Sequence, residues 1–123
     1  MTVGVTICED IWVPEPAAAA AQAGARLLVN LNASPFHLGK ADEREAVVAD
    51  RSRETGCPVV YVNLVGGQDE LVFDGESFVR DRDGVTRVRA DTFRNGLFPA
   101  DVEIMDGALN PVPGQTAPRL GTD

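Results

Sequence analysis

The residues with the clearest potential for chemistry are Cys8, Glu9 and Asp10, which directly follow the β-branched run Thr2 to Ile7. A thiol at a strand end is held rigidly, and the turn after it exposes backbone N–H groups that can donate to a developing oxyanion. Little of a free cysteine is ionised at neutral pH, so a base or cation would have to offset the two carboxylates. The alternative is that Cys8 is a small buried hydrophobic residue at a strand terminus.

Two more candidates lie in the loop Asn32 to Lys40, after the apolar run Arg26 to Leu31. His37, the only histidine, could act as general base for a thiol or be a hydrogen-bonded loop residue. Lys40, the only lysine, could be a solvated surface residue. Its place after Gly39 at a helix start opposes the helix dipole, which favours a contact with a substrate carboxylate instead.

Other reactive or glycine-rich positions favour structural interpretations. Cys57 precedes Pro58 and an apolar run, and this setting predicts burial. The segment Gly66 to Glu70 lacks the glycine spacing of phosphate-binding loops, so we expect a polar loop between strands. Tyr61 and Phe73 are expected in the core.

The elements that must position these side chains alternate between strands and helices. Strands are predicted at 2–7, 26–31 and 59–64, and helices at 17–25 and 41–55. Such a β-α-β-α-β pattern favours parallel neighbouring strands with helices packed on them. In the second helix we expect a solvated charged face over Asp42 to Glu54, with Ala46, Val47 and Ala49 on the packed side.

Farther along the chain, Asp83-Gly84 predicts a hairpin between Glu76 to Arg80 and Val85 to Arg89. From Asn95 onward Gly, Pro and Asp accumulate without periodicity. We therefore expect residues 95–123 to form an irregular tail or interdomain linker.

Composition narrows the functional classes. The 123 residues are 44% hydrophobic and 24% charged, which is typical of one globular domain. A net charge of -8 disfavours nucleic-acid and anionic-lipid partners. The apolar runs are too short to span a bilayer, and the N-terminus lacks the pattern of a signal peptide. Two distant cysteines without metal-ligand spacing disfavour a disulfide framework or a metal site, so we expect a cytoplasmic protein.

Three sequence blocks carry a family resemblance: GVTICEDIW, NLNASPFHLGK and PVVYVNLVGGQDELVFDGES. Together they resemble the glutamine-hydrolysing domain of glutamine-dependent NAD+ synthetases, a branch of the nitrilase (carbon–nitrogen hydrolase) superfamily. The resemblance extends over residues 3 to 92. The stretch GGQDELVFDG distinguishes this branch from other nitrilase-like amidases.

The resemblance implies roles for five residues. Cys8 matches the family's nucleophile, which attacks the side-chain amide of glutamine and forms a γ-glutamyl thioester. Ser34 and Lys40 match positions that hold the glutamine substrate, and Glu9 and Trp12 match positions that line the same pocket. In the family a carboxylate is the base, which favours the loop interpretation of the histidine.

The resemblance also implies an α/β fold in α-β-β-α layers, of which residues 1–94 would form the C-terminal half. The family's Glu and Lys of the catalytic triad precede the cysteine strand, and none of the first seven residues is Glu or Lys. We expect no cofactor in this chain, because ATP and Mg²⁺ belong to the synthetase domain. The alternatives are a non-catalytic remnant or assembly module, and a different nitrilase-like amidase.

Partners follow from the same resemblance. The expected substrate is glutamine, whose ammonia would be used to amidate nicotinic acid adenine dinucleotide to NAD+. The expected protein partners are the synthetase domain or the missing N-terminal half-domain, with self-association into a homo-oligomer. We expect the strands at 26–31 and 59–64 to expose apolar edges that promote this association.

Overall fold

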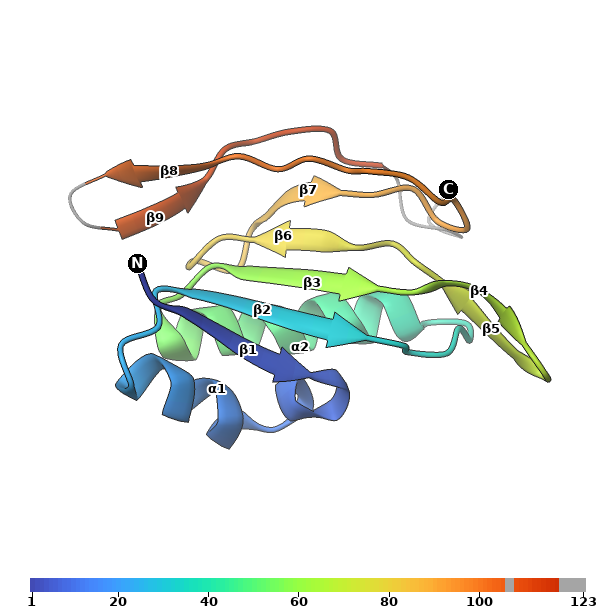
Figure 1. The fold of residues 1–123 in the computed structure, drawn as a ribbon, viewed down its shortest axis with the longest axis horizontal. Helices are drawn as coiled ribbons and strands as arrows, with labels where there is room; N and C mark the ends of the chain where they lie inside the picture. The colour runs from blue at the N-terminus through green and yellow to red at the C-terminus, as the bar shows by residue number, and fades with distance from the viewer. Residues whose placement is uncertain (106–107, 118–123) are drawn as a thin grey trace.

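The computed structural model describes residues 1–105 and 108–117, with the element order drawn in Figure 1. The elements are β1 (Val3–Ile7), the 3₁₀ turn η1 (Cys8–Trp12), α1 (Pro14–Gln22), β2 (Leu27–Asn32), α2 (Lys40–Thr55), β3 (Val59–Asn63), β4 (Val65–Gln68), β5 (Leu71–Asp74), β6 (Phe78–Arg80), β7 (Thr86–Arg89), β8 (Val102–Met105) and β9 (Ala108–Pro111).

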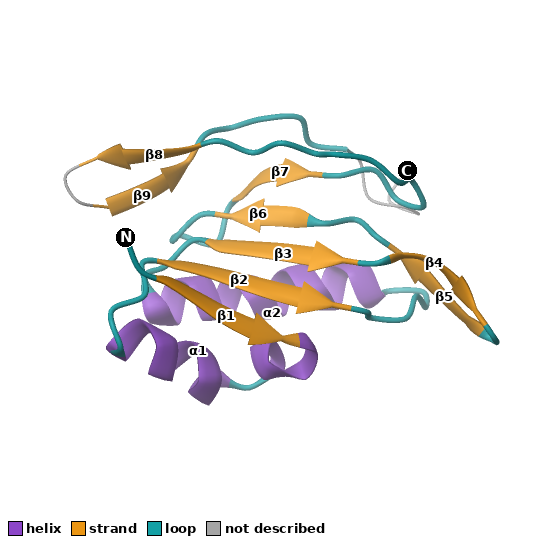
Figure 2. Ribbon diagram, viewed as in Figure 1, coloured by secondary structure: helices purple, strands orange, loops and turns teal. Residues whose placement is uncertain are grey.

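Five strands form the main sheet in the order β1-β2-β3-β6-β7. The first three run parallel, with Val5 opposite Val29 and Val29 opposite Val60, whereas β6 and β7 continue the sheet antiparallel. Both parallel crossovers contain a helix, and α1 and α2 lie on the same face of the sheet (Figure 2). The predicted α/β class and the β-α-β-α-β pattern are confirmed, and the chain forms one sheet layer and one helix layer.

Small residues let α1 lie close to the sheet. Pro14 in its first turn and the alanines that follow favour the helix and give it little bulk. A Cβ atom added to Gly4 would come within 2.9 Å of Ala20 Cβ and of Leu28 Cδ2, which is closer than packed atoms approach. The core between this helix layer and the sheet consists of Ile11, Ala17, Ala25, Leu28, Val48, Cys57, Val59, Tyr61 and Phe78.

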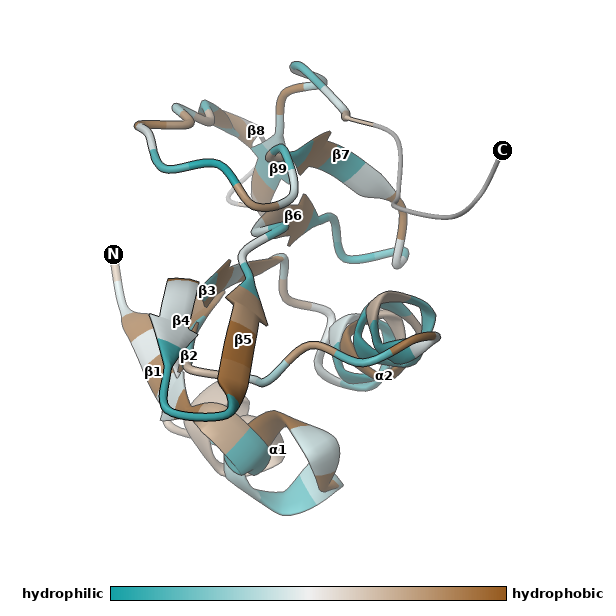
Figure 3. Ribbon diagram, turned by 90° about the vertical axis from the view of Figure 1, so that its right-hand side faces the viewer, coloured by the Kyte–Doolittle hydropathy of each residue, from teal (hydrophilic) through white to brown (hydrophobic). Residues whose placement is uncertain are grey.

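The two faces of the sheet differ sharply in exposure. Leu28, Val59 and Tyr61 point toward the helices and are at most 1% exposed. Along β1, β2 and β3 the alternate residues point the other way. Six apolar side chains in these strands, or directly after β3 in the case of Leu64, are 41 to 61% exposed: Val3, Val5, Ile7, Leu31, Val62 and Leu64. We call this group the open face. In Figure 3 both helices lie on the opposite side of the strands.

The exposed apolar surface is therefore a sheet face. The segments predicted to expose edges became β2 and β3, which lie inside the sheet, whereas β1 and β7 are its edges. The prediction of bare edges at 26–31 and 59–64 was wrong, because β2 is paired with β1 and β3, and β3 is paired with β2 and β6. Their apolar exposure comes from side chains on the uncovered face.

Helix α2 contradicts the expected division into a solvated and a packed side. Ala49 is buried as predicted, but Ala46 is exposed and Val47 is only half-buried. Two charged residues, Arg44 and Glu45, are instead 2% exposed. Charged side chains can be buried when they are paired, and both of these have partners across the helix–sheet interface.

Two later segments are more regular than predicted. The expected polar loop at Gly66 to Glu70 is mostly strand β4, which pairs with β5 in a hairpin that projects from the main sheet (Figure 1). Within the expected irregular tail, β8 and β9 form a second hairpin, and Thr116 bridges to Arg89 of β7. Residues 106–107 and 118–123 of that tail lie outside the described residues. The hairpin predicted at Asp83-Gly84 is confirmed as β6 and β7.

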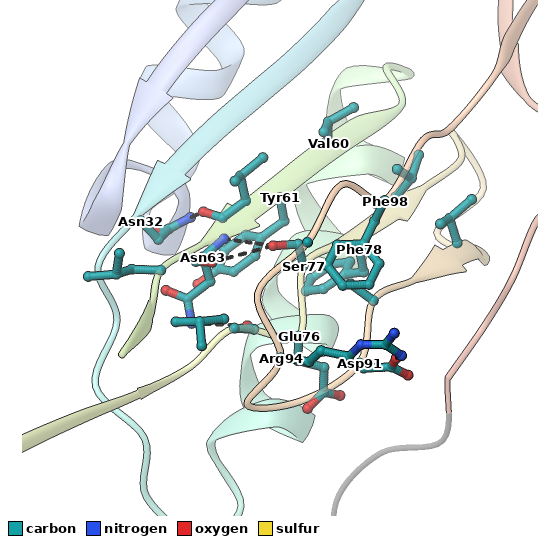
Figure 4. Close-up of a pocket in the computed structure, with 18 of the residues that line it drawn as sticks. Asn32, Val60, Tyr61, Asn63, Glu76, Ser77, Phe78, Asp91, Arg94 and Phe98 are labelled. Atoms are coloured by element: carbon teal, nitrogen blue, oxygen red, sulfur yellow. Dashed lines mark hydrogen bonds and ion pairs between the residues drawn. The ribbon is translucent and has the colours of Figure 1, made fainter. Parts of the chain in front are cut away.

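No helix of the described residues combines the length and apolar character required to cross a membrane. A cavity of about 540 Å³ lies on the side of the open face, between the strands and residues 91–100 (Figure 4). Val60, Val62 and Phe98 are among the residues that line it, whereas Cys8 is not.

Candidate active site

Cys8 lies where β1 gives way to the turn η1, and its backbone is unusual. Its φ angle is +50°, a left-handed backbone conformation that residues other than glycine seldom adopt. Such strain persists only where surrounding contacts hold it, and it is common at functional sites. The Ile7 backbone N–H donates to Asp10 Oδ2 at 3.0 Å and stabilises the turn. Cys8 is a free cysteine and is half-buried, so part of its side chain can be reached from solvent.

Polar side chains of β1 and β2 form hydrogen bonds that extend to the backbone of this turn. Thr6 Oγ1 donates to Asn30 Oδ1 at 2.6 Å, and both residues are buried. The Asn30 amide donates to Asn32 Oδ1 at 2.9 Å and to the Cys8 carbonyl at 3.5 Å. These residues lie toward the carboxyl ends of parallel strands, where α/β proteins commonly place their sites.

Ser34 is held in the loop between β2 and α2. Its backbone N–H donates to Asn63 Oδ1 at 2.9 Å, at the end of β3. Arg44 donates to the Ser34 hydroxyl from Nε at 3.2 Å and from Nη2 at 3.1 Å. The same guanidinium forms a buried ion pair with Asp74, with an Nη1–Oδ2 distance of 2.7 Å. The loop is thus bonded to β3 and α2, and through Arg44 it is linked to Asp74 of β5.

Lys40 and Trp12 meet at the start of α2. Lys40 Nζ lies 4.4 Å from the centroid of the Trp12 ring, a cation–π distance. Lys40 Nζ is also 3.9 Å from Glu43 Oε2, and the Lys40 side chain is 22% exposed, so its charge remains accessible to solvent. Glu9 is exposed and lies three residues before Trp12 in the same 3₁₀ turn. The structure therefore brings Lys40 and Trp12, two of the predicted pocket residues, into contact.

Tyr61 connects the cysteine turn with the serine loop. Burial raises the pKa of Tyr61 to about 12, and the charge of Arg44 and a side-chain hydrogen bond with Ser34 oppose this shift while Cys8 and Asp74 add to it. Its ring stacks on Phe78 with the centroids 4.8 Å apart. The core position that the sequence predicts for Tyr61 is confirmed by its exposure of 1%. The same residue also brings a neutral phenol near the candidate nucleophile.

The structure separates the remaining candidates from this site. His37 is exposed, and its Nδ1 lies 3.2 Å from the Leu38 carbonyl oxygen, which confirms a hydrogen-bonded loop histidine. Cys57 is 4% exposed, and its thiol donates to the Ala25 carbonyl at 3.4 Å, so its predicted burial is confirmed. Phe73 is buried as expected. Among the described residues no group of three or more acidic, histidine or cysteine side chains could hold a metal ion.

Sequence reasoning missed Arg44, Asn63 and Asp74, which hold the serine loop. Arg44 was assigned to a solvated helix face, and the other two were not distinguished from the strands around them. A signal was present, because Asn63 and Asp74 both fall in the third family-like block, and both follow apolar strand residues.

Comparison with known proteins identifies the family of this chain. The model of the family described as carbon-nitrogen hydrolase matches residues 1–107. The chain belongs to the carbon–nitrogen hydrolase family. The family predicted from the three sequence blocks is thereby confirmed. The predicted division of the chain at residue 94 stays a prediction.

Three proteins illustrate what this carbon–nitrogen hydrolase chain resembles. A glutamine-dependent NAD+ synthetase of Xanthomonas campestris pv. campestris is 46% identical over 110 residues, which are 89% of this chain and 20% of that protein. The glutamine-dependent NAD+ synthetase of Acinetobacter baumannii, solved with ADP, superposes with a TM-score of 0.88 at 36% identity, over 98% of this chain and 22% of that one. The chain thus spans about a fifth of the length of these two relatives.

The third protein is an amidase. A mutant of the amidase from Nesterenkonia sp. AN1 superposes with a TM-score of 0.62 at 27% identity, over 72% of this chain and 33% of that chain. That structure contains the acetamide moiety of fluoroacetamide, covalently added at the active-site cysteine of the amidase.

Proposed function

We propose that the chain is part of a glutamine amidohydrolase domain of a glutamine-dependent NAD+ synthetase, with Cys8 as its nucleophile. The observation that carries this proposal is the strained, half-buried Cys8 at the end of β1 in a chain of the carbon–nitrogen hydrolase family. The similarity to two NAD+ synthetases and the covalent cysteine adduct of the amidase support it.

The reaction uses the Cys8 thiolate to attack the side-chain amide carbon of glutamine. The tetrahedral oxyanion collapses, the C–N bond breaks, and the nitrogen leaves as ammonia after taking a proton. The γ-glutamyl thioester that remains is attacked by water, which releases glutamate and restores the thiol. Backbone N–H groups of the turn after Cys8 are suited to donate to the oxyanion. Ser34 and Lys40 would hold the substrate, with Trp12 beside Lys40 and Glu9 at the pocket rim.

The general base and lysine of the family would come from a polypeptide segment that precedes β1. Ammonia would pass to a synthetase domain, where ATP and Mg²⁺ serve the amidation of nicotinic acid adenine dinucleotide to NAD+. The protein partners are accordingly the N-terminal half-domain, the synthetase domain and a second copy of the protein.

The experiment that tests this proposal is a glutamate-release assay. We expect undetectable turnover from residues 1–123 alone and measurable turnover once the N-terminal half-domain is supplied, since base assistance alone is typically worth about 100- to 10,000-fold. Cys8→Ala should abolish the restored activity, and the matched variant Cys57→Ala should retain it. Robust turnover by the isolated chain would show that an internal group acts as base and would contradict this assignment.

A second candidate function, hydrolysis of a simple aliphatic amide, is favoured by the likeness to the Nesterenkonia amidase. The same reconstituted protein should be assayed with acetamide and butyramide beside glutamine. Preference for glutamine supports the proposal, whereas faster hydrolysis of the simple amides would favour the amidase interpretation.

A further inference from the structure

Arg44 occupies an unusual place for an arginine, because it is 2% exposed in the interface between α2 and the sheet. Its Nη1 donates to both carboxylate oxygens of Asp74, at 2.8 and 2.7 Å. Asp74 is fully buried at the end of β5. This ion pair fixes the plane of the guanidinium and directs its remaining N–H groups at the serine loop.

All of those remaining groups bind one short segment. Nε and Nη2 donate to the Ser34 hydroxyl oxygen at 3.2 and 3.1 Å. Nη2 also donates to the carbonyls of Ser34 at 2.8 Å and Pro35 at 3.1 Å. A planar guanidinium can satisfy several acceptors in one plane, and an ammonium group cannot reproduce this arrangement.

Asn63 holds the same segment from the other side. Its Oδ1 accepts from the Ser34 N–H at 2.9 Å, and its Nδ2 lies 3.4 Å from both the Ser34 carbonyl oxygen and Asp74 Oδ1. Ser34, Arg44, Asn63 and Asp74 therefore form a closed network, which we call the Ser34 clamp. Its members come from a loop, α2, β3 and β5.

The clamp determines what the Ser34 hydroxyl can do. A hydroxyl has two acceptor lone pairs and one hydrogen, and both lone pairs here face N–H groups of Arg44. Only the hydrogen remains, and the hydroxyl of the buried Tyr61, which forms a side-chain hydrogen bond with Ser34, is one acceptor for it. Ser34 is half-buried at the carboxyl edge of the sheet, so an acceptor oxygen of a bound molecule would compete for the same hydrogen.

We infer that Arg44 and Asp74 are positioning residues that fix Ser34 as an obligate hydrogen-bond donor to an acceptor oxygen of the substrate. This inference rests on the proposed function. Glutamine offers such oxygens on its α-carboxylate and on its side-chain amide. An ammonium group, which only donates, would not be accepted at this position.

The first test follows the clamp itself by amide hydrogen exchange, on the isolated chain and on the reconstituted protein. Arg44→Lys keeps the charge opposite Asp74 but removes the fork of donors. We expect the amides of Ser34 and Phe36 to exchange about tenfold faster or more, because charge-assisted hydrogen bonds hold their segment. Amides in β1 to β3 should keep their rates. The matched control is Arg53→Lys, since Arg53 is an exposed arginine of the same helix.

The exchange rates of the loop amides in Arg44→Lys decide whether the Ser34 clamp exists. Unchanged exchange of the loop in Arg44→Lys, or equal acceleration across the whole sheet, would overturn the clamp. Acceleration confined to the loop supports it, provided that Arg53→Lys matches the wild type.

The second test separates positioning from general stability through the glutaminase kinetics of the reconstituted protein. Arg44→Lys should raise KM for glutamine about tenfold and leave kcat within about threefold, since the substrate contact weakens while Cys8 is untouched. If Arg44 acts through Ser34, the double variant Ser34→Ala/Arg44→Lys should show the KM of Ser34→Ala alone. If the KM effects of the two single variants multiply in the double variant, the positioning role is refuted. It is also refuted if Arg44→Lys lowers kcat and leaves KM unchanged.

The two tests also distinguish a failure of this inference from a failure of the proposed function on which it rests. A wild-type protein that releases no glutamate overturns the proposed function and the assignment of the substrate. Hydrogen exchange still decides in that case whether the Ser34 clamp exists.

Discussion

The two faces of the main sheet are formed by the same strands and have opposite chemistry. On the helix-covered face, Asn30 and Tyr61 are at most 1% exposed and contribute to a network of hydrogen bonds and ring contacts. On the open face, Val5, Ile7 and Leu64 are between 48 and 61% exposed. Alternation along each strand produces both patterns at once.

This difference shows which parts of the candidate site the chain holds by itself. The turn of Cys8 and the loop of Ser34 are fixed by residues of the covered side, such as Asn30 and Arg44. The open face is apolar and needs a cover, and the proposed half-domain that carries the general base would supply it. Breaking one face at a time should therefore separate the integrity of the site from association.

The largest effect is expected at the buried ion pair of the covered side. Arg44→Met leaves the Asp74 carboxylate buried without its cation, which typically costs about 3–5 kcal/mol of unfolding free energy. The matched control Arg53→Met removes an exposed arginine and should stay within about 0.5 kcal/mol. Urea unfolding of the three proteins measures both values. Similar small losses in both variants would show that the covered side is not held by this pair.

A double variant makes the prediction sharper. Arg44→Met/Asp74→Leu removes both charges and should recover most of the loss, because a buried ion pair gains little net stability over apolar residues of similar volume. No recovery in the double variant would indicate that the loop contacts of Arg44, and not the unpaired charge, dominate.

The next effect concerns pH and Glu76, whose carboxylate lies on the covered side with neither oxygen hydrogen-bonded within the described residues. Burial, helped by the nearby Glu45 and Asp74, raises the pKa of Glu76 from 4.5 to about 7, although Arg89 and Arg44 oppose the shift. The folded chain binds this proton more tightly than the unfolded chain. Its stabilising contribution is therefore complete below pH 4.5 and is lost as the pH rises through about 7.

Glu76→Gln removes this titration and should make the protein more stable than wild type above pH 7. The gain should grow from near zero below pH 4.5 to at most about 3.5 kcal/mol above pH 7, because each unit of pKa shift corresponds to about 1.4 kcal/mol. Urea unfolding at about pH 4 and pH 8 gives the two ends of this range. A constant difference between the proteins at both pH values would contradict the prediction.

Adjacent residues of β1 provide the most direct comparison of the two faces. Thr6→Val deletes the hydrogen bond to Asn30 on the covered side and leaves a buried amide oxygen without that donor. A buried group left unsatisfied costs about 1–3 kcal/mol. Val5→Thr makes the reverse exchange on the open face, where Val5 is 61% exposed, and should change stability by less than about 0.5 kcal/mol. Thermal unfolding of the pair measures the contrast, and equal losses would contradict it.

The sequence predicted the elements well because their signals are local. Alternating and continuous apolar runs located β1, β2 and β3, and Asp83-Gly84 located the β6–β7 hairpin. The strand end at Cys8 was also predicted, since a β-branched run stops there. The family resemblance added Ser34 and Trp12 to the candidate Lys40, and the structure places Trp12 and Lys40 in contact.

What the sequence could not show depends on long-range pairing. Arg44 and Asp74 are 30 residues apart, and in a charged helix nothing local distinguishes a buried arginine from a solvated one. The packed side of α2 could not be predicted for the same reason. Ala46 and Val47 are more apolar than Glu45, yet Glu45 is the residue that is buried. Strand β4 was missed since its two glycines resemble a turn, and only pairing with β5 makes it a strand.

The smallest effect on stability and the clearest effect on mass are expected on the open face. We expect light scattering after size exclusion to give the wild-type chain a mass above 13.1 kDa, because burying exposed apolar surface gains about 25 cal/mol per Å². The triple variant Val5→Thr/Ile7→Thr/Val62→Thr should shift the mass toward the monomer. Threonine keeps the β-branched shape, so the unfolding free energy should change little. Val59→Thr, on the covered face of β3, is the control that should lower stability without this shift. A monomeric wild-type chain at working concentration would show that the open face needs no partner in solution.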